Sequence, residues 1–122
     1  MSNLNVECPR RFLPGQAVTG IARWRLPQVP RRLELNLLWF TRGKGTRDSQ
    51  VVDRVVIDDP PAAGQHDFSL RLPDAPYSFS GKLISLIWAV ELVAKPSREH
   101  CRVEITMSPT GTEIDLAEKA KP

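Results

Sequence analysis

The sequence has little of what marks a catalytic, membrane-spanning or disulfide-stabilised protein. Among its 122 residues are two cysteines, two histidines and one tyrosine, and aromatic residues make up 7%. No apolar run reaches the roughly 20 residues of a membrane-spanning helix, and the N-terminus lacks the basic and apolar segments of a signal peptide. We therefore interpret Cys8 and Cys101 as free thiols in a reducing compartment and expect a cytoplasmic protein.

Helical periodicity is also missing, and apolar residues instead recur at every second position. This alternation runs through six segments: 17–26, 32–41, 50–58, 65–72, 82–95 and 99–107. Because successive side chains of a strand point to opposite faces, each segment offers one apolar face to a core. The eleven prolines fall between these segments and mark turns. The pattern predicts an all-β fold: an antiparallel, immunoglobulin-like β-sandwich of about seven strands with no substantial helix.

The chain is long enough for one domain. We predict a sandwich domain over residues 1–108, then a short closing strand and a frayed polar tail over 109–122. Segment 82–95 would span about 46 Å at about 3.3 Å per residue, so we expect it to bend or to cross between the two sheets.

Two stretches resemble the N-terminal domain of arrestins. Residues 72–94 (LPDAPYSFSGKLISLIWAVELVA) are similar to a stretch of that family. In it, a strand ends, a proline-rich turn leads to the motif S-F-x-G, and a long strand follows. Residues 13–20 (LPGQAVTG) are similar to its opening turn and strand, and the order and spacing fit over residues 4–108. The resemblance implies a curved arrestin-like sandwich that serves as an adaptor for other proteins. Arrestins have two such sandwiches and this chain has one, so receptor desensitisation is not implied.

Two glycines in these stretches have a local reason of their own. Gly15 follows Pro14 and suits a tight turn that needs a positive φ. Gly20 lies in mid-strand, which indicates a bulge or a close approach of another backbone.

Residues 41–48 (TRGKGTRD) invite comparison with a phosphate-binding loop, G-x-x-x-x-G-K-[ST]. The spacing fails because Leu38 and Trp39 occupy the region of the required first glycine, and Thr46 does not directly follow Lys44. A β-branched strand also follows where a phosphate loop needs a helix N-terminus. Nucleotide binding is therefore excluded.

The same octet is better explained as the tip of a hairpin. It joins a strand that ends at Phe40 to one that begins near Gln50. Arg42, Lys44 and Arg47 are then exposed together, and we predict them as partner-binding residues for acidic or phosphorylated protein segments or anionic lipid.

Metal binding and catalysis find little support in the sequence. His100 and Cys101 are neighbours on a strand and point to opposite faces, so they cannot easily chelate one ion, and no cofactor or metal is expected. Cys101 is predicted to be a buried free cysteine, and a disulfide to Cys8 would require the first and last strands to adjoin. His66 and His100 lack the G-x-S-x-G context of a hydrolase, and the adjacent acids 58–59 suit a solvated turn. We expect no enzyme.

Three further features concern packing. Trp24, Trp39 and Trp88 fall on apolar strand faces and are predicted to lie in the core rather than on a sugar-binding platform. Glu91 needs exposure or a partner, for which Arg23 or Arg25 is a candidate. The face of segment 82–95 that contains Glu91 is otherwise rather apolar, as is the sequence around Phe40 nearby. Six apolar residues from these two regions form a candidate contact patch: Leu38, Phe40, Leu83, Ile87, Ala89 and Val93.

Charge is unevenly distributed along the chain. Residues 1–50 contain nine Lys/Arg and three Asp/Glu, a net charge of +6, and residues 51–122 contain eight and eleven, a net charge of −3. This excess is too small to indicate nucleic-acid binding. We predict a non-catalytic protein-interaction module that binds a protein partner through sheet edges and basic loops, with a homodimer through the same edges as a further expectation. The alternative is a sandwich that binds carbohydrate or lipid.

Overall fold

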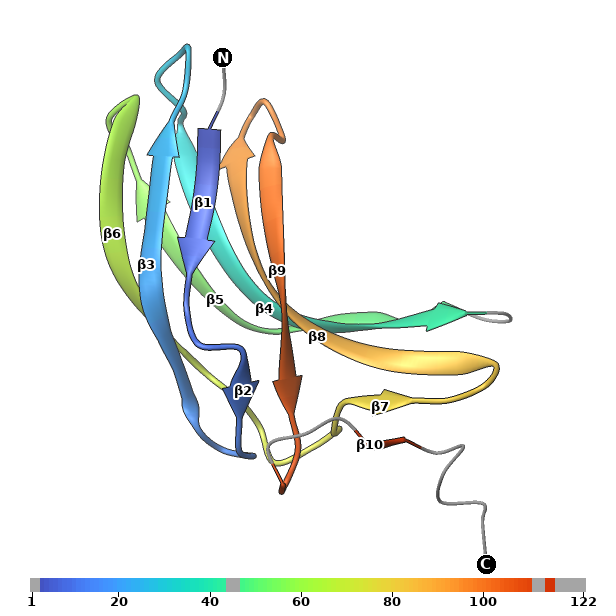
Figure 1. Ribbon diagram of the computed structural model, residues 1–122. Coiled ribbons are helices and arrows are strands. Elements are labelled where there is room, and N and C mark those ends of the chain that lie inside the picture. Colours follow the sequence, from blue (N-terminus) through green and yellow to red (C-terminus); the bar gives the residue numbers. More distant parts are fainter. Residues whose placement is uncertain (1–2, 44–46, 111–113, 116–122) are drawn as a thin grey trace, which may run out of the picture.

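The structure, a computed structural model, describes residues 3–43, 47–110 and 114–115. These residues form strands and connecting turns, with no helix among them (Figure 1). No helix in this part of the chain is long and apolar enough to cross a membrane. The strands are β1 (Asn3–Glu7), β2 (Arg11–Phe12), β3 (Ala17–Arg25), β4 (Arg32–Gly43), β5 (Ser49–Asp58), β6 (Ala63–Arg71), β7 (Phe79–Ser80), β8 (Ile84–Lys95), β9 (His100–Met107) and β10 (Ile114–Asp115).

The strands are arranged in two sheets. The first has the order β1-β3-β6, and the second contains β5, β4 and β8 with β9 and β7 both paired to β8. The long strands pair antiparallel, whereas the two-residue strands β2 and β10 pair parallel with β9 and β7. Seven of the described strands have five or more residues, and the predicted all-β sandwich is confirmed.

The core lies between the two sheets and is built from the alternating faces that the sequence indicates. Trp24 and Trp88 are buried, and each indole N–H donates to a proline carbonyl, Pro61 at 2.9 Å and Pro76 at 2.7 Å. Trp39 is partly buried and packs against this core. Because all three rings face inward, the described residues offer no tryptophan platform for sugar stacking.

The two predicted glycine roles are confirmed. Gly15 has a φ of +77°, as its turn requires. A Cβ on Gly20 would collide with the carbonyl oxygen of Glu7, so this glycine permits the close approach of the chain at the end of β1.

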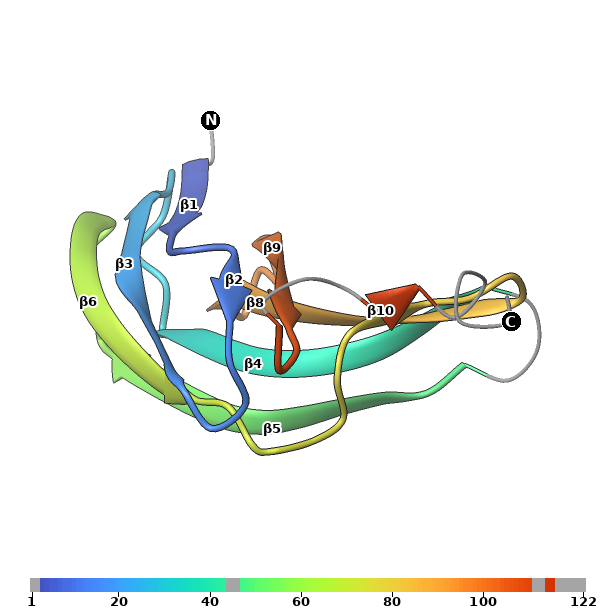
Figure 2. The same cartoon turned by 60° about the horizontal axis from the view of Figure 1, so that its bottom comes forward.

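The long strand β8 bends, as its length indicates. Figures 1 and 2 show β4 and β8 running together out of the sandwich into a projection. We call this projection the wing: the C-terminal end of β4, the N-terminal ends of β5 and β8, and β7. Strand β4 continues beyond the expected Phe40 to Gly43, and β5 begins at Ser49, so the predicted hairpin lies at the end of the wing.

Candidate interaction surface

The candidate site lies on the face of the second sheet that points away from the core, which we call the outer face. Leu38, Ile87 and Ala89 point to this face and are absent from the core cluster, yet they are 6%, 8% and 0% exposed. The predicted apolar contact patch is therefore wrong for these three side chains. Leu83 is the member of the predicted patch that is well exposed, at 67% exposure.

Phe40 and two arginines form the centre of the outer face. The guanidinium of Arg102 lies 4.8 Å from the centroid of the Phe40 ring, and that of Arg42 lies 5.5 Å from it. Both distances are within the range of cation–π attraction. The aliphatic stems of such arginines can cover apolar surface while the charged ends stay in contact with water.

Each of these arginines is also held by a glutamate. Arg102 donates to Glu91 at 2.9 Å, and Arg42 donates to Glu104 at 2.8 Å. The first pair is the more buried, since the Glu91 side chain is 18% exposed and that of Glu104 is 50% exposed. Strand β9 thus supplies the partner of Glu91, and the suggestion of an arginine at position 23 or 25 was wrong. Arg23 instead pairs with Glu7 on the other sheet at 2.7 Å.

A second group of polar contacts continues across the outer face towards β5. Glu34 is buried and lies 3.0 Å from Arg32 and 3.8 Å from Arg54. Arg54 also donates to the side-chain oxygen of the buried Asn36 at 2.6 Å. Buried polar groups on this face therefore have partners, which is the condition for keeping them inside a stable sheet.

A hollow of about 490 Å³ opens between this centre and the β4–β5 hairpin. We call it the basic hollow; it is lined by Leu38, Phe40, Thr41, Arg42, Gly43, Arg47, Asp48, Ser49 and Arg102. It brings together two of the three predicted residues, Arg42 and Arg47, both exposed. Lys44, the third, lies outside the described residues. A lining that combines apolar side chains with arginines can take a peptide that combines an apolar and an acidic side chain.

Arg102 is the residue of this hollow that the sequence did not single out. Its alternation within β9 placed it on the face opposite Cys101. Only the pairing of β9 with β8 and of β8 with β4 brings it to Phe40, which is 62 positions earlier in the chain.

A smaller hollow of about 290 Å³ adjoins the first and shares Arg42 with it. Its walls carry the hydroxyls of Ser80, Ser85 and Thr106 and the carboxylate of Glu104. The Arg42–Glu104 pair therefore stands between two depressions of the same face.

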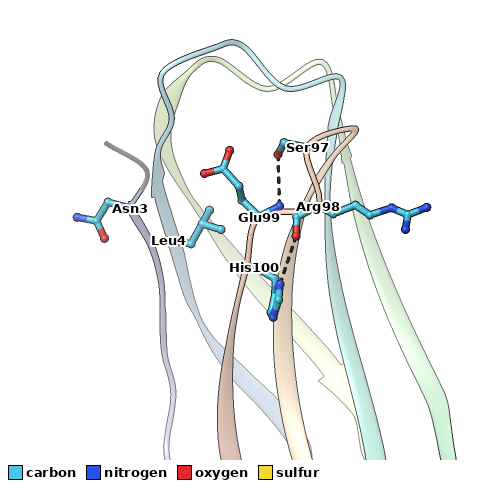
Figure 3. Close-up of a pocket in the computed structure, with 6 residues that line it drawn as sticks. All are labelled: Asn3, Leu4, Ser97, Arg98, Glu99 and His100. Carbon is cyan, nitrogen blue, oxygen red and sulfur yellow. Dashed lines mark hydrogen bonds between the residues drawn. The ribbon is translucent and has the colours of Figure 1, made fainter.

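A third hollow, of about 580 Å³, lies at the other end of the second sheet, between the start of β1 and the β8–β9 turn (Figure 3). It contains His100, Ser97 and Glu99, residue types used in catalysis. The Ser97 hydroxyl accepts the backbone N–H of Glu99 at 3.3 Å, and Nδ1 of His100 contacts the carbonyl of Arg98 at 3.2 Å (Figure 3). Neither bond joins the serine to the histidine, so this hollow contains no aligned nucleophile and base.

The two cysteines are free and half-buried. Cys101 packs against the core but is less buried than expected. Burial raises the pKa of both thiols above the ordinary value, because the thiolate is poorly solvated there. Within the described residues, no group of three His, Cys, Asp or Glu side chains could hold a metal ion.

Two curved sheets around one core, with long central strands that continue into a wing, define an arrestin-like sandwich. One solved structure with this fold is that of Spo0M, a sporulation control protein from Bacillus subtilis, which matches with a TM-score of 0.63 at 17% sequence identity. The match covers 88% of this chain and 49% of the Spo0M chain, so this chain spans about half the length of Spo0M. At this identity the likeness shows the fold alone. No protein-family model matches the chain, and a comparison with curated proteins gave no match.

Proposed function

We propose that this protein is a non-catalytic adaptor module that binds a protein partner on the outer face of its second sheet. The observation that carries the proposal is the basic hollow, whose lining combines three arginines with the apolar side chains of Leu38 and Phe40. Arginine and aromatic side chains are enriched among the residues that dominate binding energy in protein interfaces.

The electrostatics of the hollow suit a partner segment with an acidic group. Arg47 is exposed, and no ion pair joins it to a described acid. Among the described residues Arg42 has one ion pair, with the half-exposed Glu104, and an exposed ion pair of this kind is worth about 0.2–1 kcal/mol. A carboxylate or phosphate from a partner can therefore replace Glu104 at low cost.

Sheet edges offer a second mode of contact. In the described part of the chain, β1, β5 and β6 each pair with one neighbouring strand, so each has a free edge. The β4–β5 register shifts at Leu37/Leu38, and such a bulge disturbs edge-to-edge pairing along β5. The edge of β6, whose register with β3 is regular over all nine residues, is the better place for a partner strand or a second copy of the chain.

The adaptor is proposed to work in the cytoplasm. The free state of Cys8 and Cys101 agrees with a reducing compartment.

The test is an affinity capture from the native host with three forms of the protein. We expect wild type to retain a partner, Arg47→Glu to lose it, and Arg25→Glu to keep it. Arg25 is a matched control because it is an exposed arginine on β3, in the other sheet. A captured partner that is retained equally by Arg47→Glu would refute the basic hollow as its binding site.

A further inference from the structure

Strand β6 presents a free edge at the margin of the β1-β3-β6 sheet. Figures 1 and 2 both show β6 at the outer side of this sheet, with β3 on its other side. Within the described residues β3 is the one strand paired to β6, and their register is regular from Ala63 to Arg71. The backbone groups of β6 that do not face β3 are therefore open to another strand.

The ladder with β3 defines which residues of β6 turn their backbone groups outward. At one end the N–H of Leu72 donates to the carbonyl of Gln16 at 3.1 Å, and at the other the N–H of Leu26 donates to the carbonyl of Ala62 at 2.8 Å. Even-numbered residues therefore face β3. Because paired and unpaired positions alternate along the edge strand of an antiparallel ladder, five odd-numbered residues face outward: Ala63, Gln65, Asp67, Ser69 and Arg71.

Asp53 of β5 closes one end of this edge. Its Oδ2 accepts the N–H of Arg71 and its Oδ1 accepts the N–H of Arg54, each at 2.9 Å. One carboxylate thus takes an N–H from the edge strand of each sheet, and Arg71 has no outward N–H left for a further strand. At the other end β6 begins at Ala63. The free edge therefore runs over residues 63–69.

Two side chains on this free edge complement each other. The Nε of Arg23 donates to Oε1 of Gln65 at 3.4 Å, so the amide N–H groups of Gln65 remain for an acceptor. The Asp67 side chain is exposed, and no ion pair joins its carboxylate to a described basic residue. Both side chains point to the same face, because they are two positions apart on a strand. A second copy that runs antiparallel can place each of them opposite the other.

The register of such a pairing follows from the same groups. Only outward-facing residues can exchange ladder bonds, so an antiparallel self-pairing has its two-fold axis at a residue. An axis at Asp67 sets two carboxylates opposite each other, which is unfavourable. An axis at Gln65 leaves Ser69 without a partner. An axis at His66, the midpoint of the free edge, uses all of it and sets Gln65 opposite Asp67 of the second copy.

We propose that two copies of this chain pair through their β6 edges, antiparallel and centred on His66, so that their first sheets become one continuous sheet. The Nδ1 of His66 contacts the carbonyl of Asp67, and a backbone carbonyl has a second lone pair for the added strand. The inference rests on the edge contact proposed above and deepens it, and it is independent of the basic hollow. A dimer carries two basic hollows, so a partner with two acidic segments gains avidity.

The first experiment is sedimentation velocity of the full chain at concentrations from micromolar to millimolar. Wild type is expected to show a monomer–dimer equilibrium. Ser69→Pro removes an outward N–H that the β3 ladder does not use, so the fold is kept. The dissociation constant of the dimer should rise at least ten-fold, because the bond is lost at both symmetry-related positions.

Val56→Pro is the matched control on the edge of β5. Asp59 donates its N–H to Arg31, so the even-numbered Val56 turns its N–H away from β4. Val56→Pro should dimerise as wild type does, and circular dichroism should show unchanged folding in both proline variants.

A second experiment tests the register by cross-linking. In the proposed dimer His66 faces itself in a non-hydrogen-bonded pair with Cα atoms about 4.5 Å apart, within the range of a disulfide. His66→Cys should therefore give a linked dimer under mild oxidation, with the linkage identified by mass spectrometry. Ser69→Cys should not, because Ser69 lies opposite Ala63 of the second copy. Wild type under the same oxidant is the control for Cys8 and Cys101.

Several outcomes overturn the proposal: a wild type that stays monomeric at millimolar concentration, an unchanged dissociation constant in Ser69→Pro, or an equal rise in Val56→Pro. Linkage of Ser69→Cys in preference to His66→Cys also overturns it. The partner capture with Arg47→Glu tests the adaptor function separately, because Ser69 lies on the other sheet and lines no part of the basic hollow. A monomeric wild type that still captures its partner would refute the dimer and leave the adaptor function standing.

Discussion

The two arginines that lie over Phe40 should contribute unequally to stability, and a pair of double-mutant cycles can measure the difference. In the Arg102–Glu91 pair the side chains are 40% and 18% exposed, and in the Arg42–Glu104 pair they are 60% and 50% exposed. The separations are nearly equal, 2.9 and 2.8 Å, so burial is the main variable. A lower effective dielectric around the first pair strengthens its attraction.

The expected magnitudes follow from this difference. For Arg102–Glu91 we expect a coupling free energy of about 1–1.5 kcal/mol, between the values of exposed pairs and of hydrogen bonds to buried charged groups. For Arg42–Glu104 we expect no more than about 0.5 kcal/mol, as for other exposed pairs. Replacement by glutamine at each of the four positions removes the charges and keeps most of the side-chain volume.

The assay is urea unfolding followed by tryptophan fluorescence, which reports on the buried Trp24 and Trp88. The coupling free energy is the change in unfolding free energy of the double mutant minus the sum of the changes in the two single mutants. High salt should reduce the Arg42–Glu104 coupling proportionally more than the other one. Equal couplings, or a larger one for Arg42–Glu104, would show that burial does not govern these pairs.

The same difference has a functional consequence. Because Arg42 is weakly held, Arg42→Gln should leave the free energy of unfolding almost unchanged and still weaken capture of the partner. Arg102→Gln should lower the free energy of unfolding and also weaken capture of the partner, since Arg102 is the ion-pair partner of Glu91. A loss of stability in Arg42→Gln as large as in Arg102→Gln would contradict the view that Arg42 can exchange its carboxylate.

Two further predictions concern the core and the thiols. Leu37→Ala, at a fully buried position of β4, should lower the free energy of unfolding by about 2–5 kcal/mol through lost burial and an unfilled cavity, and a urea midpoint close to that of wild type would contradict the packing described. Cys8 and Cys101 should react slowly with a thiol reagent near neutral pH and fast in denaturant, because burial raises the pKa of both groups. Since the unfolded thiols ionise first, the free energy of unfolding should fall as the pH rises above about 8.5, and it should not depend on these groups below that pH. Substitution of both cysteines by alanine should remove this part of the alkaline decrease, and an unchanged decrease would assign it to other groups.

Much of the fold follows from local chemistry that is visible in the sequence. The alternation around Trp24 and Trp88 defines which faces are buried, because the period of two is a property of the extended backbone itself. The turn at Gly15 needs only a positive φ, and the hairpin between β4 and β5 needs only two strands with a short polar connection, so both could be predicted from neighbouring residues.

Only the tertiary structure decided which strands lie beside one another. The sequence left the partner of Glu91 open and overlooked Arg102, because strand order depends on how two twisted sheets close around a core and not on the pattern within any one strand. The same limit explains the misjudged outer face, since Leu38 and Ala89 are apolar on a face away from the core and become buried through neighbours distant in the chain. The sequence by itself determined which residues lie on a common face, and the packing of the sheets decided which of them meet.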